Sequence, residues 1–78
     1  MRQKKPCIVL SFATTTQAMA VEDYCKQHSL PGRLIPVPTQ ITAGCGFAWK
    51  ADITDKESLL AALTEGGITW DAATELLL

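Results

Sequence analysis

No two cysteines of this sequence form a Cys-x-x-Cys pair, and the three that are present, Cys7, Cys25 and Cys45, lie far apart. This spacing excludes a local thioredoxin-like dithiol and a local zinc knuckle, which both need a close pair. A metal site would require the cysteines and the single histidine, His28, to converge from distant parts of the chain, and we expect none. The odd number and low density of cysteines also argue against a secreted disulfide scaffold.

The sequence also has little net charge and no long apolar run. Seven basic and eight acidic residues leave a formal charge of −1, which gives no electrostatic reason to expect nucleic acid or an anionic membrane as a partner. No apolar run approaches the roughly 20 residues that span a bilayer, and the stretch after Pro6 is too short for a secretory signal. We therefore expect a cytoplasmic protein. A Ser-His-Asp set, a pair of acids in a cleft and a phosphate-binding loop are all absent from the sequence.

The composition is that of a folded protein. Hydrophobic residues make up 47% and charged residues 19% of 78 residues, which indicates one globular domain over residues 1–78. A chain of this length is near the lower limit for a self-sufficient core.

The first half of the sequence predicts a β-α-β unit. Residues 7–12 are rich in β-formers and predict a first strand. Thr14 and Gln17 have the spacing of a capping box, which predicts that a helix begins there and runs to about residue 28. Residues 33–35 predict a second strand that ends at a proline, because proline cannot donate to a ladder.

The second half repeats the pattern. Residues 47–51 alternate well enough for a third strand, and Thr54 with Glu57 repeats the capping-box spacing at the start of a second helix. Two glycines then end that helix. A last strand is predicted from Ile68 on, although the residues from Ala72 on could also continue as a helical turn.

The order β-α-β-β-α-β predicts an α+β, ferredoxin-like fold, with two helices on one face of a four-stranded antiparallel sheet. Alternation along the first strand divides its residues between the faces: Cys7, Val9 and Ser11 on one, Ile8, Leu10 and Phe12 on the other. If the second set faces the helices, the other face is open and only moderately polar. Such a face would allow a partner to dock or the protein to self-associate weakly.

Cys45 lies between two glycines, at the end of a proline-stiffened stretch over residues 36–46. Gly44 and Gly46 leave the thiol unshielded and allow positive φ, so that several backbone N–H groups can point at one anion. We interpret Cys45 as a reactive thiol, with Thr42 as a donor to its sulfur. The alternative for Cys45 is a tight turn in which it packs as a small hydrophobe. The alternative for Thr42 is a hydroxyl that is hydrogen-bonded to the local backbone.

The middle of the chain resembles a family of small selenium/sulfur carrier-like proteins, a domain formerly of unknown function. The matching residues are the Leu-Ile-Pro-Val-Pro run at 34–38, then Ile41-Thr42, then Cys45-Gly46, at the spacing typical of the family. Thr39 stands where the family often has a basic residue, which removes a nearby positive charge that would lower the pKa of the thiol. Cys7, at the start of a strand, and Cys25, on a helix face, are expected to be buried and unreactive.

The resemblance implies that the protein holds sulfur or selenium on Cys45, as a persulfide or selenopersulfide, with Thr42, Gly44 and Gly46 forming the binding loop. It further implies a donor of the cysteine desulfurase or selenocysteine lyase type and an acceptor enzyme, so that the protein is at most sulfurtransferase-like. No cofactor other than the carried atom is expected. The alternative interpretation is a non-catalytic ferredoxin-like interaction module that binds a partner through the open sheet face.

Overall fold

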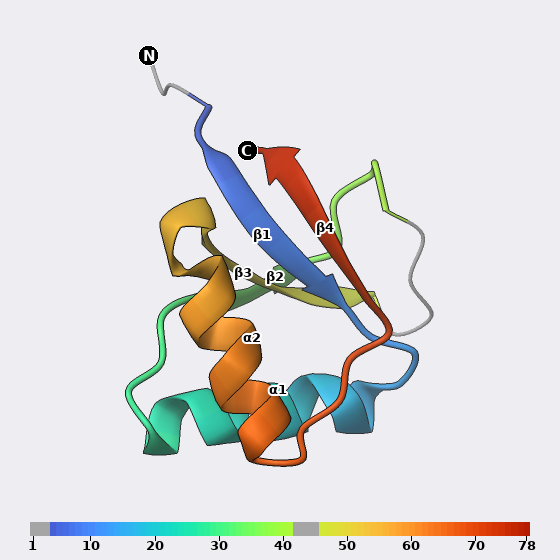
Figure 1. Ribbon diagram of the computed structural model, residues 1–78. Coiled ribbons are helices and arrows are strands. Elements are labelled where there is room, and N and C mark those ends of the chain that lie inside the picture. Colours follow the sequence, from blue (N-terminus) through green and yellow to red (C-terminus); the bar gives the residue numbers. More distant parts are fainter. Residues whose placement is uncertain (1–3, 42–45) are drawn as a thin grey trace.

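The computed structural model describes residues 4–41 and 46–78, which form an α+β domain (Figure 1). The elements in chain order are β1 (Pro6–Ser11), α1 (Thr15–Gln27), β2 (Arg33–Pro36), β3 (Phe47–Asp52), a 3-10 turn η1 (Ile53–Asp55), α2 (Lys56–Glu65) and β4 (Ala72–Leu77). The strands form one sheet in the order β2-β3-β1-β4, and all neighbouring pairs are antiparallel. The prediction of two helices and a four-stranded antiparallel sheet is confirmed. Within the described ranges, no helix has the length and apolar character needed to traverse a bilayer.

The start of α1 follows the local sequence signal. The backbone N–H of Gln17 donates to the Oγ1 of Thr14 at 3.2 Å, as the capping-box spacing predicts. The side-chain oxygen of Gln17 accepts from the backbone N–H of Ala13 at 2.9 Å, one residue before the cap. Two backbone donors that the helix cannot satisfy itself are thereby paired.

The predicted capping box of the second helix is wrong. Asp52 accepts from the backbone N–H of Thr54 at 3.0 Å and from its hydroxyl at 2.9 Å, and the chain first makes the η1 turn. Helix α2 then begins at Lys56 with no side-chain hydrogen bond at its cap residue, Asp55. Thr54 lies inside η1, which Asp52 caps, so α2 begins two residues too late for Thr54 to be its cap.

The last segment is a strand, but it begins later than predicted. β4 pairs with β1 along its whole length, from Pro6 opposite Leu77 to Ser11 opposite Ala72. The helical alternative for these residues is therefore wrong. So is the start at Ile68, whose side chain packs against the helix-side core instead of joining the sheet.

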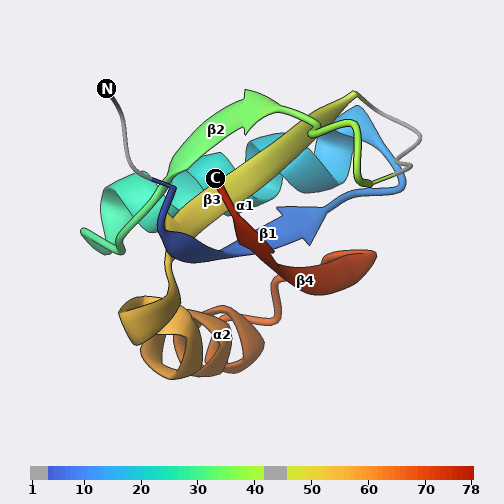
Figure 2. The ribbon, with the colours of Figure 1, turned by 90° about the horizontal axis from the view of Figure 1, so that it is seen from above.

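The core lies between the sheet and the two helices, which Figures 1 and 2 show on the same side of the sheet. Ile8 and Leu10 of β1 belong to this core, and so does Phe12, the residue that follows the strand. The predicted division of these residues between the two faces is therefore confirmed. The helix side chains buried with them are Ala18, Val21, Cys25, Leu59 and Leu63.

The opposite face of the sheet is not open at its centre. Cys7, Val9 and Ala48 are buried there, with at most 2% of their surface exposed. They are covered by partly buried residues from β2, the segment after it and the end of the chain: Ile35, Val37, Ile41, Leu76 and Leu78. Both helices lie on the other side of the sheet, as predicted, but the centre of this face is not open, because the segment after β2 and the end of the chain pack on it. Alternation within strands carries no information about such segments.

Candidate functional site

Three of the four predicted site residues, Thr42, Gly44 and Cys45, lie outside the described residues. The fourth, Gly46, is described, and so is the chain up to Ile41. All four belong to the connection between β2 and β3, two neighbouring antiparallel strands. The described residues therefore define the two ends of the candidate site.

Both ends of this connection are held to the sheet. The backbone N–H of Val37 donates to the carbonyl of Gly46 at 3.0 Å, which continues the pairing of β2 with β3 by one step. Within the first part of the connection, the N–H of Ile41 donates to the carbonyl of Pro38 at 3.0 Å and closes a turn. We call the face of the sheet opposite the helices the far face, and its buried residues Cys7, Val9 and Ala48 the far-face cluster. The side chains of Val37 and Ile41 pack on this cluster. The residues between Ile41 and Gly46 therefore start and finish at fixed points on the domain.

Gly46 has a backbone conformation that other residues rarely adopt. Its φ is +80°, as predicted for a glycine beside the thiol, and a Cβ built there would meet no atom within 4 Å. The position therefore requires glycine for its backbone angle and not for lack of space.

The other two cysteines are buried, as predicted. Cys7 is 2% exposed and its Sγ donates to the carbonyl of Leu76 at 3.3 Å. Cys25 is 1% exposed, and burial raises the pKa of its thiol to about 11. Cys7 belongs to the far-face cluster and Cys25 to the helix-side core, so the sheet separates them and they cannot ligate one metal ion.

The raised pKa of Cys25 predicts a loss of stability at alkaline pH. The unfolded chain loses this thiol proton near the ordinary value of 9.0, whereas the folded protein keeps it until about 11. Between these pH values the unfolded state binds fewer protons, so the free energy of unfolding falls as pH rises, by ~2–3 kcal/mol in total. Urea denaturation across this range should show that Cys25→Ala, although less stable at neutral pH, loses correspondingly less on alkalinisation. Parallel curves for the two proteins would contradict this prediction.

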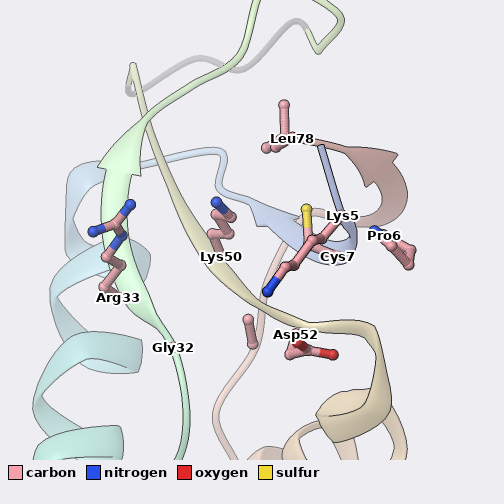
Figure 3. Close-up of a pocket in the computed structure, with 9 residues that line it drawn as sticks. Lys5, Pro6, Cys7, Gly32, Arg33, Lys50, Asp52 and Leu78 are labelled. Carbon is pink, nitrogen blue, oxygen red and sulfur yellow. The ribbon is translucent and has the colours of Figure 1, made fainter. Parts of the chain in front are cut away.

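A groove that the sequence did not predict lies on the far face, at the end of the sheet remote from the β2–β3 connection (Figure 3). We call it the cationic groove. It has a volume of about 430 Å³ and is lined by Lys5, Pro6, Cys7, Gly32, Arg33, Lys50, Ala51, Asp52 and Leu78.

Comparison with known proteins identifies the family. No curated protein and no solved structure matches the chain significantly. A family model described as "Putative Se/S carrier protein-like" matches residues 7–75 of the 78. This range contains both helices, strands β2 and β3, parts of β1 and β4, and Cys45. Because the match covers nearly all of the chain, the protein belongs to the Se/S carrier protein-like family.

Proposed function

We propose that the protein carries sulfur or selenium on Cys45, as a persulfide or selenopersulfide, between a donor enzyme and an acceptor enzyme in the cytoplasm. The observation that carries the proposal is the family match over residues 7–75, which includes the Cys45-Gly46 pair. The burial of Cys7 and Cys25 supports it, because it leaves Cys45 as the thiol that can do this chemistry. We also propose that the fold is ferredoxin-like, a proposal supported by the strand order β2-β3-β1-β4.

The transfer needs no external oxidant. The Cys45 thiolate attacks the outer sulfur of a donor cysteine persulfide, a new S–S bond forms at Cys45, and the donor's S–S bond breaks. The donor cysteine leaves as a thiolate and the outer sulfur keeps its proton, so charge and electrons balance. Attack by an acceptor nucleophile on the same outer sulfur then regenerates the Cys45 thiolate. A selenium atom in the outer position follows the same course.

The loop residues would act on the charge of this thiolate. Backbone N–H groups around Gly44 and Gly46, together with the Thr42 hydroxyl, are the donors we assign to the sulfur. With Thr39 in the place of a basic residue, these neutral donors would have to hold the anion without a nearby cation. Glycine at position 46, with its φ of +80°, fits a backbone that bends around one atom.

Loading by a donor enzyme tests the proposal. Incubation with a cysteine desulfurase and cysteine, in the absence of reductant, should give an intact-mass gain of one sulfur atom, and a selenocysteine lyase with selenocysteine a gain of one selenium atom. The added atom should be released by dithiothreitol, because a persulfide is reduced by thiols. Peptide mapping should place it on the peptide that contains Cys45.

Two variants make the result specific. Cys7→Ala and Cys25→Ala should both load as well as the unchanged protein, since both sulfurs are buried in the fold. The proposal is wrong if the protein gains no mass with either donor, or if the gained atom maps to Cys7 or Cys25. The alternative function, docking of a partner on an open apolar sheet face, has less support, because residues such as Val37 and Ile41 already cover that face.

A further inference from the structure

The cationic groove brings together positive charges from three parts of the chain. Lys5 precedes β1, Arg33 begins β2, and Lys50 lies within β3. Lys50 shares a face with Ala48, and Arg33 with Ile35, both of which belong to the far-face cluster. Figure 3 shows these three side chains around one hollow.

The sheet register sets two of these charges directly against each other. Arg33 and Lys50 are Cα partners in the β2–β3 ladder. Side chains in such a pair start about 4.5–5.5 Å apart at Cβ, and like charges placed opposite each other destabilise a sheet. An anion between the two cations would offset this repulsion.

Within the part of the chain that the structure describes, no carboxylate forms an ion pair with Arg33 or Lys50. In residues 4–41 and 46–78 the one ion pair joins Lys56 to Glu75, away from the groove, and the remaining segments contain no acidic residue. Asp52 is the only acidic side chain in the groove lining, and its Oδ1 is engaged by the backbone N–H and hydroxyl of Thr54. Those hydrogen bonds, and to a lesser extent the charge of Lys5, hold the pKa of Asp52 below its ordinary value.

We propose that the cationic groove binds a small ligand that carries a phosphate-type oxyanion, held between Arg33, Lys50 and Lys5. A guanidinium offers two parallel donors to such a group, and the two ammonium groups supply point charges around it. The lining also includes Pro6, Cys7 and Leu78, so the groove has an apolar wall beside the charges. A phosphate monoester with a short apolar part has the matching chemistry.

The size of the groove favours a small molecule over a polymer. A volume of about 430 Å³ falls in the range of small-molecule pockets, roughly 300–1,000 Å³. The net charge of −1 provides no extended positive surface for nucleic acid or for a long acidic segment. The charge is concentrated at one hollow, as a single oxyanion requires.

This site is separate from the proposed carrier loop. The connection leaves the sheet where Pro36 lies opposite Phe47, and the Arg33–Lys50 pair is three residues further along both strands. At about 3.3 Å per residue this separation is roughly 10 Å. Ligand binding is therefore expected to be the same in the Cys45→Ser variant, and the two proposals can fail independently.

Titration with inorganic phosphate and with propyl phosphate, monitored by backbone amide NMR at low salt, tests the inference. Both ligands should shift the amide signals of Arg33, Lys50 and their neighbours, with Kd values of roughly 1 mM or tighter. Tighter binding of the ester than of inorganic phosphate would indicate that the ligand is a phosphate ester. Equal binding of the two would indicate that it is a free oxyanion. Binding should weaken steeply with added NaCl, because the groove is open to solvent and its charges are screened.

Charge-matched variants separate the groove from general electrostatics. Lys50→Gln and Arg33→Gln should each raise the Kd about tenfold, whereas Lys26→Gln, which removes an exposed charge from α1, should leave it unchanged. Lys50→Gln should also keep or raise the melting temperature without ligand, since it removes the like-charge pair, and should lose the increase that phosphate gives the unchanged protein. Equal effects of all three substitutions, or binding of a hexaglutamate peptide without binding of either phosphate, would overturn the proposal.

Discussion

Replacing Cys45 with serine is expected to slow the alkylation of the folded protein by iodoacetamide at least about 100-fold. Only the thiolate reacts, and a thiol with a pKa of about 11, like that of Cys25, is ionised in fewer than about one molecule in a thousand at neutral pH. Cys7 is 2% exposed and engaged with the carbonyl of Leu76, so the reagent cannot reach its sulfur in the folded state. In the Cys45→Ser variant, Cys7 and Cys25 can therefore react only after local or global unfolding exposes them.

A mass-spectrometric time course with stoichiometric reagent measures this effect. Cys7→Ala and Cys25→Ala are the matched controls, and both should be labelled at the rate of the unchanged protein. The pH dependence of that rate should give Cys45 an apparent pKa below the free value of about 8.5, if the loop donors stabilise the thiolate. A Cys45→Ser protein that is labelled as fast as the parent, or an apparent pKa above that value, would show that the loop does not activate its thiol.

Local signals in the sequence were sufficient for several parts of the fold. Alternation along β1 assigned Ile8, Leu10 and Phe12 to the helix side, because a strand in one sheet has only two faces to choose from. The Thr14–Gln17 spacing located the start of α1, because a cap and its partner are only three residues apart. The interpretation of Cys45 rests on a short contiguous motif that lies within the range of the family match, and it stays a prediction.

The predictions that failed concern features set by competing hydrogen-bond acceptors or by residues far apart in the sequence. Thr54 had the spacing of a cap but lost to the carboxylate of Asp52, and spacing alone does not rank two acceptors. The cationic groove arises because the β2–β3 register sets Arg33 opposite Lys50, 17 positions later in the sequence. Neither residue is unusual by itself. A site of this kind becomes visible only when the register of the hairpin is known.

Gly32→Ala is expected to lower the free energy of unfolding by about 3 kcal/mol or more. The φ of Gly32 is +113°, so any side chain there is strained by about 1–3 kcal/mol. The new Cβ would also overlap the indole of Trp49 and lie 2.6 Å from the backbone oxygen of Lys50, in the middle of β3. Relief of that overlap would break the hydrogen bond from Trp49 Nε1 to the carbonyl of Pro31, now 3.1 Å long, at a further cost of about 1 kcal/mol.

Gly46→Ala is the matched control for this prediction. Gly46 also has a positive φ, +80°, but a Cβ there meets nothing within 4 Å, so only the backbone strain applies and the loss should be about 1 kcal/mol. Urea denaturation of both variants measures the difference directly, with the slope against denaturant as a check that unfolding stays two-state. Equal losses at the two positions would mean that Trp49 moves aside without cost. Because Trp49 precedes Lys50 on β3, a large loss confined to Gly32→Ala would show that this indole fixes the strand that carries the groove's central lysine.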